Sequence, residues 1–182
     1  MTIVKNSVAA TIVASAAILG GTQAFATSKE FTVYAPVEAR EAHFTYFTSD
    51  GEANPHGEGK ANVGDVRYGS RGLFDQDGMQ VGTTYYVDTL LTEPKAGEVG
   101  KRDMRFTAVF EDGAIIGRYL GDEPVKGDFA NAEGAWLTER VHPYTIVGGT
   151  GVFAGATGVV DVKPDAKGHN TESTFRIQLP TS

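Results

Sequence analysis

The sequence predicts an all-β domain, a barrel or a sandwich of about eight short strands. Three observations support this fold class. Runs of alternating apolar and polar residues, rich in β-branched and aromatic side chains, are separated by glycine- and proline-containing turns. Asp112-Gly113 is a dipeptide that strongly indicates a tight hairpin. No window after residue 26 shows the period of a helix, so we expect little or no helix there.

The first 26 residues have the features of a secretory signal peptide. Lys5 supplies a positive charge, residues 7–19 form an apolar run, and Ala24-Phe25-Ala26 is a suitable cleavage site. The apolar run is shorter than the roughly 20 residues that a membrane-spanning helix needs, so we expect no membrane anchor. The sequence therefore predicts a secreted or periplasmic chain that is cleaved after Ala26, with a single β domain over residues 27–182.

Charge and composition exclude several classes of protein. The chain has a formal net charge of −7 and no basic run, so nucleic acid is not an expected partner. It has no cysteine, which excludes disulfides, thiolate zinc sites and cysteine nucleophiles. The histidines share no metal-ligand spacing, so we expect no metal and no cofactor.

The expected strands alternate with polar loops along the chain. In order they are 31–37, 43–47, 63–75, 79–91, the hairpin 104–121, 135–140, 144–148, 157–162 and 171–179. The strand 79–91 is the longest. In the first strand, Val33 lies on one face, together with Phe31 and Ala35, and Tyr34 lies on the other.

The hairpin 104–121 is the best-specified unit. If Asp112 and Gly113 are the two turn residues, one face contains the pairs Phe110–Ile115, Ala108–Gly117 and Phe106–Tyr119. In a barrel this aromatic face would point inward. Ala108 and Gly117 are small, so we expect them to leave room for a ligand between the rings.

A glycine-rich segment, YTIVGGTGVFAGATGVVDV (residues 144–162), predicts a strand, a tight corner and a returning strand. We expect structural roles at the corner for Gly148, Gly149, Gly151 and Gly155. The alternative is a dinucleotide-binding loop. That loop requires a following helix, whereas the residues after the glycines are β-branched, so we favour the corner.

This segment resembles the late signature of the allene oxide cyclase and dirigent families. Residues 63–90 and 105–121 are similar to the early and central segments of the same families, so the resemblance extends over most of residues 63–162. It implies a single antiparallel eight-stranded β-barrel with an apolar cavity, usually in a homo-oligomer (dimer or trimer). The first strand of plant allene oxide cyclases resembles V-Y-E-I-N-E, in which a Glu and the Asn help to hold an ordered water. Laid on residues 33–38, those positions hold Ala35 and Val37, and only Glu38 matches. We therefore assign no catalytic residue.

Candidate cavity residues come from the strands and from this resemblance. They are Tyr34, Glu38, Tyr86, Phe106, Phe110, Gly117, Tyr119 and Tyr144. A barrel of about eight strands is either filled by its own side chains or holds one small ligand. Two functions therefore stay open. The protein either binds a polyene, epoxide or phenolic molecule and guides its cofactor-free cyclisation, isomerisation or coupling, or it is a non-catalytic binding, sequestering or structural protein.

Overall fold

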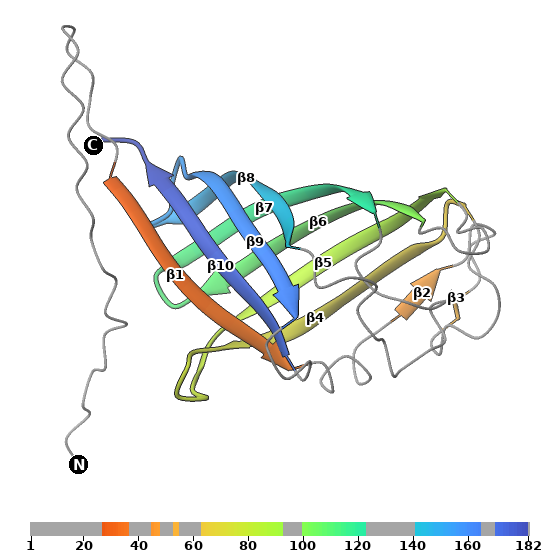
Figure 1. The fold of residues 1–182 in the computed structure, drawn as a ribbon, viewed down its shortest axis with the longest axis horizontal. Coiled ribbons are helices and arrows are strands. Elements are labelled where there is room, and N and C mark those ends of the chain that lie inside the picture. Colours follow the sequence, from red (N-terminus) through yellow and green to blue (C-terminus); the bar gives the residue numbers. More distant parts are fainter. Residues whose placement is uncertain are drawn as a thin grey trace, which may run out of the picture.

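The computed structural model describes residues 27–36, 45–47, 53–54, 63–92, 100–122, 141–164 and 170–181 (Figure 1). Every regular element in these ranges is a strand. The strands are β1 (Thr27–Pro36), β2 (Thr45–Phe47), β3 (Ala53–Asn54), β4 (Val66–Phe74), β5 (Gln80–Thr92), β6 (Lys101–Phe110), β7 (Gly113–Asp122), β8 (His142–Gly151), β9 (Thr157–Pro164) and β10 (Asn170–Leu179). The part of the chain that is described holds no helix long and apolar enough to cross a membrane. The expected strand 135–140 lies outside the described residues.

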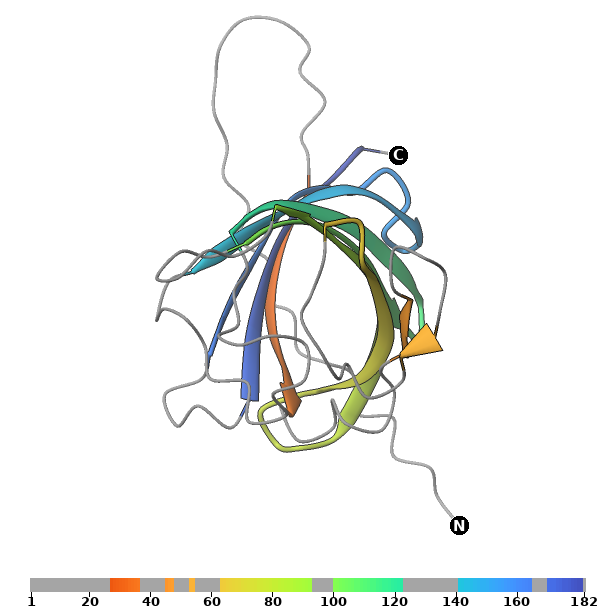
Figure 2. The same ribbon diagram turned by 90° about the vertical axis from the view of Figure 1, so that its right-hand side faces the viewer.

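Eight of the described strands close into an antiparallel barrel, which confirms the predicted fold class. Their order is β1-β10-β9-β8-β7-β6-β5-β4, and β1 pairs with β4 to close the circle. The strands curve around a common axis in Figure 2. Closure occurs at the pair Tyr34–Phe74, while the first part of β4 pairs with the short β2–β3 hairpin instead.

Alternation along each strand decides which side chains enter the barrel. On β1, Val33 and Ala35 are buried, whereas Tyr34 belongs to the opposite, outward face. The buried apolar residues of the other strands complete the interior. They include Leu73, Leu90, Met104, Ala108, Ile115, Ile146, Val160, Phe175 and Ile177.

The β6–β7 hairpin has the predicted faces but a different register. The two turn residues are Glu111 and Asp112, and Gly113 is already paired with Phe110. The predicted pairs are therefore wrong by two residues: Ala108 faces Ile115, Phe106 faces Gly117 and Met104 faces Tyr119. A shift of two keeps every side chain on its face.

Gly113, at the start of β7, is required by the contact with β8 rather than by the turn. A type I′ turn requires positive φ at both central residues, and no described non-glycine residue has positive φ. Gly113 instead lies against β8, where a Cβ atom would overlap the carbonyl oxygen of Thr150. Its absent side chain thus allows two strands to approach, rather than allowing the chain to turn.

The glycine-rich segment forms the predicted strand, corner and returning strand. β8 ends at Gly151 and β9 begins at Thr157. Gly151 and Gly155 have φ values of 59° and 71°, in the left-handed region that favours glycine. At Gly149 a Cβ would clash with the carbonyl oxygens of Phe153 and Ala114, whereas at Gly148 it would meet nothing within 4 Å.

Candidate functional site

The barrel interior has an aromatic half and a polar half. The aromatic half contains Phe31, Phe106, Phe110, Phe153 and Phe175. The Phe31 ring stacks on Phe175 with centroids 4.9 Å apart, and Phe110 meets Phe31 edge-on at 5.6 Å. These contacts fill the end of the barrel that is near the β6–β7 turn.

The space expected beside Gly117 is occupied. Because Phe106 is paired with Gly117, its ring lies over the glycine, where a Cβ atom would overlap it. Ala108 and Ile115 are fully buried beside this pair. The expectation of an open gap between Ala108 and Gly117 was therefore wrong, because the two-residue change of register places a ring there.

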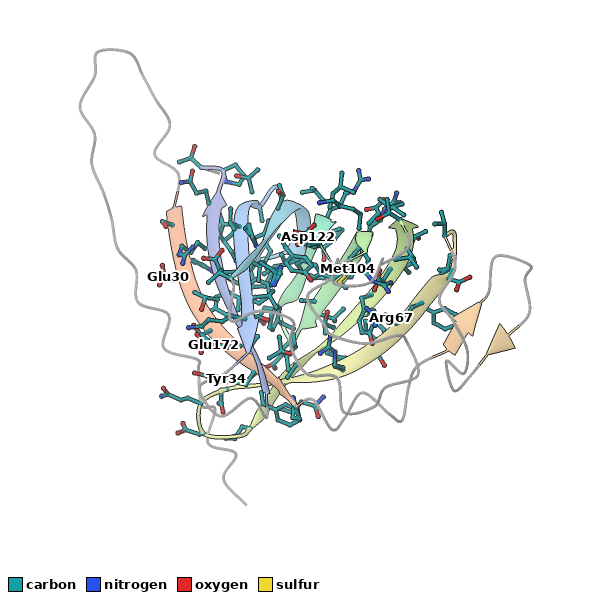
Figure 3. The ribbon with its side chains drawn as sticks, turned by 45° about the vertical axis from the view of Figure 1, so that its right-hand side comes forward. Glu30, Tyr34, Arg67, Met104, Asp122 and Glu172 are labelled. Carbon is teal, nitrogen blue, oxygen red and sulfur yellow. The ribbon has the colours of Figure 1, made fainter. Side chains whose placement is uncertain are left out.

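The polar half is built around Asp88, whose side chain is 0% exposed. Asp88 on β5 is directly paired with Arg67 on β4, and an Arg67 Nη2 atom hydrogen-bonds its Oδ2. Arg102 on β6, which is 1% exposed, donates from Nη1 to Oδ1 at 3.1 Å. Arg67 on β4 and Met104 on β6 are labelled in this part of the barrel in Figure 3. Each carboxylate oxygen thus receives a charged donor.

A third arginine enters the same half without sharing this carboxylate. Arg71 follows Arg67 on the inner face of β4, and its guanidinium carbon lies 5.2 Å from the centre of the Tyr86 ring. Its Nε and Nη1 atoms are buried and have no hydrogen-bond partner among the described residues. A guanidinium stays protonated in proteins, so this charge is permanent.

Two tyrosines and a histidine cover the opposite wall. Tyr119 on β7 donates its hydroxyl proton to the carbonyl oxygen of Asp122 at 2.9 Å, and it also contacts His142 Nδ1 at 3.1 Å. Since the hydroxyl has one proton, His142 donates from Nδ1 to Tyr119. Tyr144 on β8 stacks on Tyr119 and donates to the sulfur of Met104 at 3.3 Å.

The environment keeps both phenols protonated. Burial raises the pKa of Tyr144 far above its usual value of 10.0, and the nearby Asp88 carboxylate adds to this, while Arg71 acts in the opposite direction. Burial also raises the pKa of Tyr119. These side chains can therefore donate hydrogen bonds at neutral pH but cannot act as bases.

The candidate residues from the sequence have different positions. Tyr86, Tyr119 and Tyr144 line the polar half, and Phe106 and Phe110 belong to the aromatic half. Tyr34 alternates with the buried Val33 and Ala35 and so lies on the outer face of β1. Glu38 lies outside the described residues.

Sequence reasoning missed the charged residues of the interior. These are Asp65, Arg67, Arg71, Asp88 and Arg102, together with His142. One signal was present, because Asp88 alternates with Tyr86 and Leu90, which share its face. A charged side chain in a strand is usually expected to point toward solvent. Only the register between strands shows that the opposite charges of these residues lie next to one another inside the barrel.

Comparison with known proteins agrees on the fold. No protein-family model matches the chain, and no curated protein is similar to it in sequence. The solved structure of a pyocyanin demethylase is similar with a TM-score of 0.55 at 18% identity, covering 81% of this chain and 98% of that one. A pterocarpan synthase dirigent protein gives 0.56 at 16% identity, covering 85% and 95%.

A heme-binding cyclase of neoabyssomicin biosynthesis has the same barrel, with a TM-score of 0.51 at 15% identity. The match covers 83% of this chain and 64% of the cyclase. The fold is therefore that of the dirigent-like barrels, as the resemblance in sequence implied. At these identities the likeness concerns the fold alone.

Proposed function

We propose that the protein binds a small, largely apolar molecule in the polar half of its barrel and holds it in a conformation that favours cofactor-free cyclisation, isomerisation or coupling. One observation supports this above the others. The described interior includes three arginines, two buried carboxylates and three tyrosines, although apolar side chains fill the other half without such groups. Buried charge is costly, so such a group is typical of a site rather than of a core.

The chemistry that these residues can provide is orientation and hydrogen-bond donation. Asp88 accepts from two arginines, so it is not available as a base. Tyr144 is held protonated and donates only to the weak acceptor sulfur of Met104, so its proton can turn to a ligand, whereas the Tyr119 proton is already donated to Asp122. Arg71 supplies a fixed positive charge. Placing a flexible molecule among fixed donors, away from water, lowers the barrier to a ring closure that the molecule can undergo by itself.

Three proteins with similar barrels support this type of role. Their names describe a demethylase, a dirigent protein of pterocarpan synthesis and a cyclase, all of which act on small organic molecules. Because their sequences differ strongly from this one, they supply no residue roles here.

Binding without catalysis is the second candidate function. It is favoured by the state of Asp88 and the two phenols, since both Asp88 oxygens accept from arginines and burial keeps Tyr119 and Tyr144 protonated. A sequestering protein needs only affinity. Product formation from a bound polyene, phenolic or fatty-acid epoxide would distinguish the two functions.

We also propose that the protein is exported and self-associates. β1 begins at Thr27, the first residue after the expected cleavage site. On the outside of the barrel several large apolar side chains are exposed, among them Leu120 at 65% and Val147 at 60%. An apolar outer surface suits a contact between copies of the chain. Light scattering of the purified protein would measure its oligomeric state, and a monomer at all concentrations would contradict the proposal.

Neighbouring tyrosines on β5 provide a matched test of binding. Tyr86 is 6% exposed and faces the interior, whereas Tyr85 is 54% exposed and faces outward. A panel of polyenes, phenolics and fatty-acid epoxides is screened for compounds that raise the melting temperature. Tyr86→Leu should weaken binding of any such compound at least about tenfold, or ~1.4 kcal/mol, and Tyr85→Leu should leave it unchanged. Equal effects, or no compound that binds, would refute the proposal.

A further inference from the structure

The three interior arginines are not equally balanced by acidic groups. Arg67 and Arg102 each hydrogen-bond one oxygen of Asp88. Asp65, just before β4, is the other buried carboxylate among the described residues. Among the described residues, these three guanidinium groups thus outnumber the buried carboxylates by one. Arg71 is the arginine that does not share Asp88.

Arg71 carries this additional positive charge, in a fixed position and with hydrogen-bond donors that are not used. Arg71 stacks on the Tyr86 ring, which holds the guanidinium in position. Within the part of the chain that the structure describes, the buried Nε and Nη1 atoms of Arg71 lack hydrogen-bond partners. Leaving charged donors unsatisfied away from water is strongly unfavourable, and an arginine cannot relieve this by losing its proton. A ligand that accepts from Arg71 would remove this penalty.

The surroundings of Arg71 define what such a ligand would resemble. Arg71 lies over Tyr86, which is two residues before Asp88 on the inner face of β5. Asp88 is in turn paired with Met104, to which Tyr144 hydrogen-bonds, so these side chains are neighbours in the polar half. Tyr86, Met104 and Tyr144 contribute aromatic and apolar surface to it. A flat, conjugated body would pack against these side chains, and one anionic oxygen group would complete the charge balance.

We propose that Arg71 binds the single anionic group, a carboxylate or a phenolate, of the molecule whose apolar body the barrel holds. This rests on the proposed binding function and adds the charge of its ligand. Arg71 is then a ligand-binding residue, while Arg67, Asp88 and Arg102 form the support beside it. A neutral molecule of the same shape would leave Arg71 unsatisfied and bind more weakly.

Matched probes test the charge directly. Calorimetry on the full-length protein compares 2-naphthoate with 2-naphthamide, and 4-nitrophenolate with 4-nitroanisole, at a pH where both anions are ionised. Each anion should bind at least about tenfold more tightly than its neutral partner. The naphthoate and nitrophenolate arms show whether a carboxylate or a phenolate is preferred.

Variants then locate the effect. Arg71→Leu should abolish the preference for the anion while the neutral probes bind as before, and Arg71→Lys should retain part of it. Arg118→Leu, at an outward position that is 49% exposed, is the control and should leave the binding of all four probes unchanged. Arg71→Leu should also melt no lower than the parent without ligand, because it removes an unsatisfied charge.

The outcomes separate this inference from the function on which it rests. Neutral and anionic probes that bind the parent equally would overturn the role of Arg71 and leave the binding function intact. An anion preference that survives Arg71→Leu would overturn it as well. If no probe binds and the wider compound panel also fails, both proposals are wrong. The comparison of probes on the parent is informative even if a variant does not fold.

Discussion

Phe106 on β6 and Gly117 on β7 are directly paired, and the Phe106 ring lies where a side chain at position 117 would begin. The same ring meets Tyr144 edge-on at 5.8 Å and Phe175 at 6.4 Å. Because Gly117 has no side chain, the Phe106 ring can lie over it. There the ring contacts Tyr144 of the polar half and Phe175 of the aromatic half.

We predict that Gly117→Ala destabilises the protein by about 1–3 kcal/mol, because the new methyl group forces Phe106 out of its position. In a Phe106→Leu background the same substitution should cost much less. Denaturant unfolding of the four proteins forms a double-mutant cycle, with an expected coupling of about 0.5–3 kcal/mol. Additive effects would mean that the ring does not depend on the glycine.

The bridge from Asp88 to Arg67 and Arg102 should be essential for stability. Asp88→Asn removes the carboxylate that two buried guanidinium groups share and should cost about 3–5 kcal/mol. Asp161→Asn is the matched control, since Asp161 contacts Arg176 at 2.6 Å on the surface, with the Arg176 side chain 52% exposed. The control should change stability by less than about 1 kcal/mol. Similar losses in both variants would contradict the buried role of Asp88.

The glycine corner offers a graded series. Gly149→Ala and Gly151→Ala should each cost about 1–3 kcal/mol, because a Cβ meets backbone carbonyls at both positions and Gly151 has a left-handed φ. Gly148→Ala should stay within about 0.5 kcal/mol of the parent, since a Cβ there meets nothing within 4 Å. Thermal melts of the three variants measure this, and an equal loss at Gly148 would show that the corner is constrained differently.

The surface pair Asp103–Arg118 should contribute a small, acid-sensitive stability. Both guanidinium contacts, at 2.9 Å, lower the pKa of Asp103 below its usual value of 3.8, mainly through the hydrogen bond from Arg118. A lowered pKa stabilises the fold above pH 3.8, and the contribution disappears as the pH falls through the folded-state value. NMR titration should show Asp103 ionising below 3.8, and Arg118→Gln should raise that pKa. If the pKa of Asp103 is the same in Arg118→Gln as in the parent, the two side chains do not form this ion pair in solution.

Export can be tested on the natural protein. The expected signal peptide ends at Ala26, and β1 begins at Thr27, so cleavage there would leave the barrel intact. Mass spectrometry of the secreted or periplasmic fraction should find a mature chain that begins at or near Thr27. A chain that retains residues 1–26 and remains in the cytoplasm would refute the prediction.

The alternation of side chains along the sequence was enough to predict the β architecture. Val33 and Ala35, or Phe106 and Ala108, reveal an inward face because a strand turns successive side chains to opposite sides. The positions of Gly151 and Gly155 likewise predicted a corner, since few other residues adopt positive φ. These features depend on local geometry, which a sequence records directly.

The register between strands was decided only by the tertiary structure. The Asp112-Gly113 dipeptide is typical of a turn, yet the turn lies at Glu111 and Asp112, because Gly113 is needed where β7 meets Thr150 of β8. That contact joins residues far apart in the chain. In the observed register Phe106, rather than Ala108, is paired with Gly117, and its ring fills the space that we had expected beside the glycine.

The polar half of the interior depends on the same long-range pairing. Arg67, Asp88 and Arg102 lie on three different strands, and their charges compensate one another only when these strands are in register. Taken singly, each resembles a solvated strand residue, since an isolated charge is too costly to bury. The alternation of apolar and polar residues along each strand was therefore enough to predict the β architecture. The charged lining of the interior followed only from the pairing of residues between strands.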